Sequence, residues 1–204
     1  PGTAYTFSVV ATDAASHTSN VANANATTLT IPAAPTPTHD ARLVYSIYSD
    51  AYTPVVAQDF WRSNYGGVAP LSENDYLLYR MTNNMIVWGN ADQTGSIHPT
   101  DEFYTDGEHF GLDVSNMAYL HFDVWCDVAD QLNTVNINDQ AVTIPTTRTI
   151  AGQWVSFDVD ITGVALADRQ NVRWLKFHPF TNCNAAIDNV YFWSYGAKAS
   201  ADNW

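Results

Sequence analysis

The chain has 204 residues and carries 21 acidic against 8 basic side chains, which gives a formal net charge of −13. An acidic surface of this kind repels phosphate backbones and anionic lipid, so neither nucleic acid nor a membrane surface is an expected partner. Apolar residues make up 46% of the chain, enough for a substantial core, yet no apolar run is long enough to insert into a bilayer. Abundant Thr, Asn, Tyr and Trp, with few Lys, are typical of a secreted or cell-surface all-β protein.

Residues 1–31 are predicted to form a β-hairpin. Apolar side chains occupy the odd positions from Tyr5 to Ala11, and a second strand near 21–30 follows a turn around 14–20. The segment PGTAYTFSVVATDAASHTS resembles the penultimate strand of fibronectin type III domains, where a Tyr after a Pro-Gly turn forms the tyrosine corner; Tyr5 occupies that place. The resemblance implies a two-strand remnant of an immunoglobulin-like domain, which informs us about neighbouring domains rather than about activity.

A proline-rich stretch follows the hairpin. Three prolines fall within residues 32–37, and they disfavour both helix and sheet, which predicts a semi-stiff extended spacer. We therefore place a domain boundary here. The expected organisation is a fibronectin-like fragment over 1–31, a Pro/Thr linker over 32–40, a β-sandwich over 41–196 and a tail over 197–204.

From Ala41 onward, short alternating apolar segments separated by turn residues predict a β-sandwich. Segments 119–125 and 172–178 each alternate between an apolar inner face and an outer face that bears Trp, His and charged residues. The polar segment 90–108 is predicted to be a long loop and a functional insertion. The expected strands lie near 42–48, 76–81, 84–88, 109–114, 119–125, 132–138, 141–144, 153–160, 172–178 and 186–193.

Five short sequence segments of the predicted β-sandwich resemble the calcium-stabilised jelly-roll modules of bacterial secreted polysaccharide-degrading enzymes. They are SIYSDAY (46–52), NYGG (64–67), LHFDVW (120–125), WVSFDVDI (154–161) and IDNVYFW (187–193). The resemblance implies a non-catalytic carbohydrate-binding module that binds a polysaccharide or oligosaccharide and is covalently linked to catalytic and fibronectin-like domains. Segment 90–108 departs from the pattern of the family and leaves the identity of the glycan open. The alternative is a structural or adhesive β-sandwich that spaces modules or contacts another protein.

Two aspartates are candidate calcium ligands. If strands 42–48 and 186–193 pair antiparallel, the end of the first lies beside the start of the second, and Asp50 comes close to Asp188. Converging carboxylates near turn carbonyls suit Ca²⁺, which takes six to eight oxygen ligands. In similar modules the Asp before the last strand holds structural calcium, and here that residue is Asp188. The alternative is that both side chains only hydrogen-bond local backbone.

Sugar recognition requires flat apolar rings with polar groups nearby. If segments 119–125 and 172–178 are neighbours, their outer side chains form one concave face with two indole rings above a polar floor. A loop rim and the edges of the insertion supply further aromatic candidates, whereas the alternative is that the tryptophans pack beneath loops. The candidates are Trp125, His121, Asp123, Trp174, Lys176 and His178 on the face, Trp61 and Tyr65 on the rim, and Trp88 beside the insertion.

Cys126 and Cys183 are predicted to form one disulfide that staples the ends of these two strands, with two buried free thiols as the alternative. The six histidines show no metal-ligand spacing, so zinc is not expected. The chain contains no GxSxG, HExxH or P-loop motif, and its acidic residues are too numerous for carboxylate spacing to indicate a glycosidase. The sequence therefore predicts an accessory domain without catalytic activity.

Overall fold

The computed structural model describes residues 3–27, 30–53, 86–97, 111–173 and 175–195, with backbone only for 86–97, Pro179 and Asn182. The chain divides into two compact units, Pro1–Pro32 and Ala33–Trp204.

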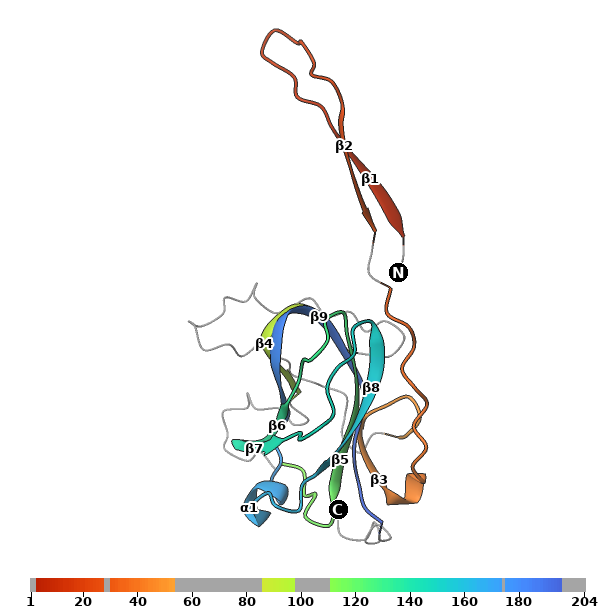
Figure 1. Cartoon of the computed structure of the whole chain (residues 1–204), viewed down its shortest axis with the longest axis vertical. Coiled ribbons are helices and arrows are strands. Elements are labelled where there is room, and N and C mark those ends of the chain that lie inside the picture. Colours follow the sequence, from red (N-terminus) through yellow and green to blue (C-terminus); the bar gives the residue numbers. More distant parts are fainter. Residues whose placement is uncertain (1–2, 28–29, 54–85, 98–110, 174, 196–204) are drawn as a thin grey trace. The chain divides into compact units, whose positions relative to one another are not determined.

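The first unit is an antiparallel hairpin of β1 (Ala4–Val9) and β2 (Ala22–Thr27), in which Ala4 pairs with Thr27 (Figure 1). This confirms the predicted pair of strands. The alternating apolar side chains remain exposed: Tyr5 and Phe7 retain 49% and 56% of their surface and stack with ring centroids 6.4 Å apart. The hairpin therefore has an apolar face but no core of its own among the described residues.

The second unit is built almost entirely from strands, as the sequence predicts. All pairings between its named strands are antiparallel. Among the described residues no helix is long and apolar enough to cross a membrane. The elements are the 3-10 turn η1 (Ala41–Leu43), β3 (Val44–Tyr48), β4 (Ile86–Ile97), β5 (Tyr119–Cys126), β6 (Thr134–Ile137), β7 (Gln140–Thr143), β8 (Gln153–Asp160), α1 (Leu166–Arg169) and β9 (Leu175–Trp193).

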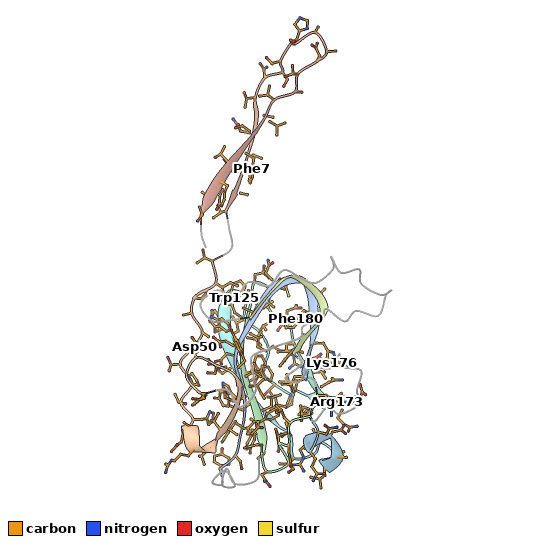
Figure 2. All side chains as sticks on the ribbon, turned by 180° about the vertical axis from the view of Figure 1, so that it is seen from behind. Phe7, Asp50, Trp125, Arg173, Lys176 and Phe180 are labelled. Atoms are coloured by element: carbon orange, nitrogen blue, oxygen red, sulfur yellow. The ribbon has the colours of Figure 1, made fainter. Side chains whose placement is uncertain are left out.

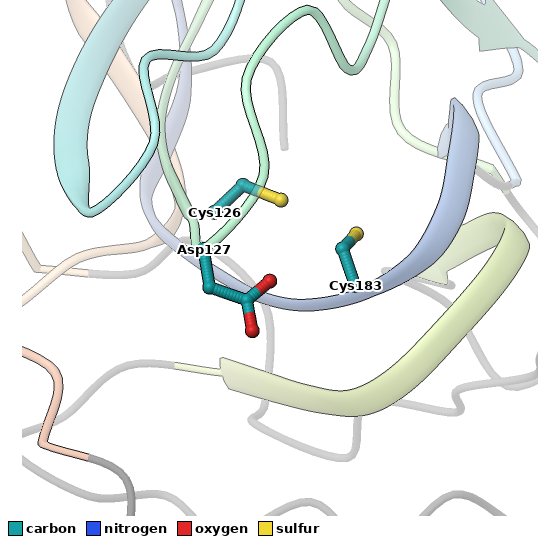
Figure 3. A group of neighbouring side chains, drawn as sticks. All are labelled: Cys126, Asp127 and Cys183. Carbon is teal, nitrogen blue, oxygen red and sulfur yellow. The ribbon is translucent and has the colours of Figure 1, made fainter.

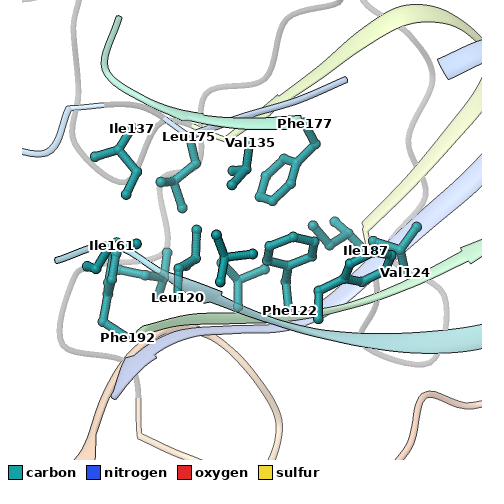
Figure 4. Close-up of a cluster of buried hydrophobic side chains, with 14 of the residues drawn as sticks. Leu120, Phe122, Val124, Val135, Ile137, Ile161, Leu175, Phe177, Ile187 and Phe192 are labelled. Atoms are coloured by element: carbon teal, nitrogen blue, oxygen red, sulfur yellow. The ribbon is translucent and has the colours of Figure 1, made fainter. Parts of the chain in front are cut away.

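Strand β9 connects the two layers of the sandwich. Its C-terminal half pairs with β3 and β5, and β5 pairs in turn with β8. Its N-terminal half pairs with β6, which pairs with β7, while β4 follows β9 over both halves. The apolar core fills the space between the layers, where the Phe122 and Phe177 rings meet at 4.9 Å (Figure 4). Leu120, Phe122 and Val124 face Val135, Leu175 and Phe177 across this core.

Several predicted boundaries are wrong. Residues 175–178 and 186–193, predicted in two separate strands, belong to one continuous strand, and residues 90–97 of the predicted loop lie in β4. Pairing with β9 along its length overrides the polar composition of this segment. Of the predicted strand 109–114, the described residues 111–114 contribute only an isolated bridge between Leu112 and Val172, and the predicted strand 76–81 lies outside the described residues.

Residues 33–40, predicted to be a spacer, are attached to the second unit. The Asn189 side-chain amide donates to the carbonyl of Pro35 at 2.8 Å, and the Tyr52 hydroxyl donates to the carbonyl of His39 at 2.6 Å. The His39 ring also hydrogen-bonds the Tyr191 hydroxyl at 2.8 Å. These contacts fix the segment, which we call the strap (33–40), against strand β9 and Tyr52, which follows β3.

Candidate functional site

The concave face predicted from segments 119–125 and 172–178 does not form. Strand β5 pairs with β8 and the C-terminal half of β9, whereas Lys176 and His178 lie opposite Asn136 and Thr134 of β6. Because the apolar sides of both segments face each other across the core, their polar sides point to opposite faces of the sandwich (Figure 4). Trp125 and Lys176 accordingly lie on opposite sides of the unit (Figure 2).

The three candidate residues of β5 are buried instead of forming the floor of a groove. Trp125, His121 and Asp123 retain 3%, 6% and 1% of their surface, so none presents a flat face to a ligand in this structure. The candidates Trp61, Tyr65 and Trp174 lie outside the described residues, and of Trp88 only the backbone is described, opposite Ala185.

Lys176 and His178 form local contacts on the other face. The Lys176 ammonium lies 3.8 Å from the Asp139 carboxylate, and His178 Nε2 lies 2.8 Å from the Asn136 side-chain oxygen. Burial, followed by the positive charge of Lys176, lowers the pKa of His178. These contacts bring together neither an aromatic platform nor a catalytic pair.

A polar network on the outer face of β5 includes His121, Asp123 and Asp158. The Nδ1 atom of His121 lies 2.9 Å from Asp158, and its Nε2 atom lies 3.6 Å from Asp123. Burial has the largest single influence and lowers the pKa of His121, but the interactions with the carboxylates of Asp123 and Asp158 together outweigh it and raise the pKa to about 8. The Asp123 carboxylate also accepts hydrogen bonds from Ser156 at 2.5 Å and Asn189 at 2.7 Å. The network therefore holds β8, β5 and β9 together.

The predicted pairing behind the calcium hypothesis is confirmed. Strand β3 pairs antiparallel with β9, from Val44 opposite Trp193 to Tyr48 opposite Val190. A bulge then interrupts β9 at Asn189, whose φ of 52° lies in the left-handed region that Asn tolerates. Asp188, Asn189 and Asp50 line a pocket of about 220 Å³, whose remaining walls are Ala51 and residues 33–37 of the strap.

The chemistry of this pocket fits a calcium ion. Asp188 is only 4% exposed; burial, followed by the negative charges of Asp50 and Asp123, raises its pKa to about 7 despite a hydrogen bond from the Asn189 N–H. In the described part of the chain, neither Asp188 nor Asp50 forms an ion pair with Lys or Arg. A hard cation would supply the missing positive charge, and the carboxylates and nearby backbone carbonyls are the oxygen ligands that Ca²⁺ takes.

An aromatic cluster that was not among the predicted site residues lies at one end of the outer face of β5 and β9. Tyr119 stacks on Trp193 at 4.6 Å, and Tyr195 meets both rings edge-on, at 4.8 Å from Trp193 and 5.8 Å from Tyr119. Tyr195 is 77% exposed, whereas Trp193 is 5% exposed and supports the other two rings. The signal was the alternation of Tyr191, Trp193 and Tyr195, which places rings on one side of a strand.

Carboxylates border the aromatic cluster on β8. The Trp193 indole N–H donates to Asp158 at 2.8 Å, which fixes the orientation of the ring. Asp160 lies opposite Tyr119, and it accepts two hydrogen bonds from Thr162 through the same oxygen, Oδ1. The Thr162 hydroxyl and then its backbone N–H lower the pKa of Asp160, so an ionised carboxylate stands beside the rings at neutral pH.

Cys126 and Cys183 are both buried and are free thiols in the structure, so the predicted disulfide is not present in it. Their sulfur atoms nevertheless lie near each other, within 4.8 Å, and close to the Asp127 carboxylate (Figure 3).

No protein-family model and no curated protein matches the chain. Solved structures similar to it include a family 29 carbohydrate-binding module, with 12% identity over 73% of this chain and 86% of the other, at a TM-score of 0.43. Two variants of a family 29 module, one complexed with cellulohexaose and one with mannohexaose, each share 11% identity over 73% of this chain and 89% of theirs, at TM-scores of 0.43 and 0.42. The likeness is too distant to assign the chain to a family.

Proposed function

We propose that the second unit is a non-catalytic carbohydrate-binding module that holds a secreted polysaccharide-degrading enzyme on its substrate. Tethering of this kind raises the local concentration of substrate without any chemistry in the module itself. The phrases shared with secreted jelly-roll modules, the acidic and aromatic-rich composition, and an all-β sandwich support this function. The observation that carries the proposal is the aromatic cluster in which buried Trp193 supports partly exposed Tyr119 and exposed Tyr195; we call these three rings the aromatic platform.

The aromatic platform combines the two features that sugar recognition requires. The exposed ring of Tyr195 and the partly exposed ring of Tyr119 offer apolar surface to the C–H face of a pyranose. The carboxylates of Asp158 and Asp160 are adjacent hydrogen-bond acceptors for hydroxyl groups. Because Asp160 uses Oδ1 for both of its bonds to Thr162, its second oxygen is oriented by these bonds and can accept from a ligand.

We also propose that the pocket of Asp50 and Asp188 holds a structural Ca²⁺ ion. Both carboxylates and the carbonyl groups of the strap would contribute oxygen ligands, and the ion would offset the negative charge that burial concentrates at Asp188. The ion would act on stability, because it links β3, β9 and the strap rather than facing the aromatic platform.

Replacing Tyr195 with alanine should weaken binding of the cognate polysaccharide about tenfold without lowering the melting temperature. A stacked aromatic ring contributes roughly 1–2 kcal/mol, and Tyr195 is too exposed to contribute much to folding. Affinity gel electrophoresis on β-glucans, xylan and mannan identifies the ligand, and isothermal titration with its oligosaccharides measures the loss. Tyr5→Ala is the matched control, because Tyr5 is a 49% exposed tyrosine of the first unit that also stacks on a neighbouring ring.

If none of these polysaccharides retains the parent protein, the carbohydrate-binding function is contradicted and a structural spacer is favoured. If a polysaccharide is bound but Tyr195→Ala and Tyr5→Ala bind equally well, the function stands and the aromatic platform is not its site.

A further inference from the structure

Two cysteines that are 57 positions apart in the sequence meet where β5 ends beside β9. Cys126 is the last residue of β5, and Cys183 lies in β9, opposite Ala91 of β4. Ligand atoms of Cys126, Cys183 and Asp127 all lie within 4.8 Å of one another. Figure 3 shows both sulfur atoms and the carboxylate directed into the same space.

Backbone and side-chain hydrogen bonds hold this group in place. The Asp127 N–H donates to the Asn184 carbonyl at 3.1 Å, and the Asn184 N–H donates to Asp127 Oδ1 at 2.7 Å. The Asn184 side-chain amide donates to Asp127 Oδ2 at 2.6 Å, and the Gly152 N–H donates to the Cys126 carbonyl at 2.7 Å. Each carboxylate oxygen thus accepts one bond from Asn184 and keeps capacity for another partner. The carboxylate is oriented independently of any ligand.

The two sulfur atoms are buried and lie close to each other. Cys126 and Cys183 are 0% and 2% exposed, so bulky reagents have little access to either. The hydrogen bond between the two thiols lowers the pKa of Cys126, whereas the same bond, followed by burial, raises the pKa of Cys183. The Asp127 carboxylate is more exposed than the sulfur atoms.

We propose that Cys126, Cys183 and Asp127 bind one thiophilic divalent cation such as Zn²⁺, with water as the fourth ligand. Around a tetrahedral zinc ion, sulfur ligands at about 2.3 Å from the metal lie about 3.8 Å from each other, which matches a group whose atoms lie within 4.8 Å. Two thiolates and a carboxylate bring three negative charges to the ion, and binding releases the thiol protons. The ion joins the end of β5 to β9 and is independent of the proposed carbohydrate and calcium sites.

The test uses the full chain, reduced and desalted under anaerobic conditions, with excess Ca²⁺ present to saturate sites for hard cations. Titration with Co²⁺ should give one equivalent with sulfur-to-metal charge-transfer bands in the near ultraviolet, and Zn²⁺ should displace it. Cys126→Ser and Cys183→Ser should each remove these bands and lower Zn²⁺ affinity at least about a hundredfold, more than the loss of an outer-shell partner costs. Asp127→Asn should lower affinity by about tenfold or more. Asp130→Asn is the matched control in the same loop and should bind as the parent does; Asn also tolerates the positive φ of 58° at that position.

Two results would overturn the proposal. One is the absence of charge-transfer bands at equimolar Co²⁺ in the reduced parent protein. The other is a protein that, isolated without reductant, contains no titratable thiol and is two hydrogens lighter than its reduced form. That mass would mean that the sulfur atoms form the disulfide expected from the sequence, with a bond of about 2.05 Å that leaves no thiolate for a metal.

Discussion

Replacing Trp125 with alanine is expected to destabilise the second unit by about 2–4 kcal/mol, rather than to act on ligand binding alone. Trp125 is 3% exposed and pairs across β5 with Trp154 of β8 and Ala186 of β9. Truncation of a buried aromatic ring costs about 3–5 kcal/mol through lost contacts and the cavity left behind. Part of this cost is offset, because the indole N–H of Trp125 has no hydrogen-bond partner among the described residues.

Trp125→Phe separates these two contributions. It keeps an aromatic ring in the same place and removes the unpaired N–H, so it should change the free energy of unfolding by less than half as much as alanine does. Urea denaturation, followed by tryptophan fluorescence, measures both variants. If the alanine variant has the same free energy of unfolding as the parent but no longer binds polysaccharide, Trp125 forms an exposed binding surface after all.

Calcium is expected to stabilise the protein more at pH 8 than at pH 5. The folded-state pKa of Asp188 is raised from 3.8 to about 7, so without metal the folded protein holds a proton that the unfolded chain releases near pH 4. Stability without calcium therefore falls as the pH rises from about 4 through 7, by an amount on the order of 4 kcal/mol in total. Calcium competes with this proton for Asp188, so its apparent affinity falls as the pH drops below about 7; at pH 8, saturation at a hundred times the apparent Kd stabilises the protein by about 2.7 kcal/mol by mass action.

Thermal melts with calcium and with excess EDTA at both pH values measure this effect. Titration calorimetry at pH 6 in buffers of different ionisation enthalpy should also show nearly one proton released per calcium ion bound, and almost none at pH 8. Asp188→Asn is the decisive variant, because it should stabilise the calcium-free protein at pH 8 and abolish the response to calcium. An unchanged calcium response in that variant would place the ion elsewhere.

The strands that the sequence predicted well are those whose alternation is regular. Residues 119–125 and 153–160 alternate between apolar and polar side chains, and the structure has strands at 119–126 and 153–160. The antiparallel pairing of segments 42–48 and 186–193 was also predicted correctly, because both segments, at the two ends of the domain, show the same alternation. Segment 90–97 was missed because its residues are polar, and only its pairing with β9 makes it a strand.

In the regularly alternating strands, the sequence alone indicated which side chains point into the space between the layers, because alternation along a strand is a local property of the backbone. It also indicated that Asp50 and Asp188 belong to one region, through the pairing of two strands. It did not determine which outer faces share a surface. The continuity of β9 across both layers separates His121 and Asp123 from Lys176 and His178, and this depends on long-range pairing. The bulge at Asn189 and the burial of Trp125 arise only when distant segments pack, so tertiary structure alone decided them.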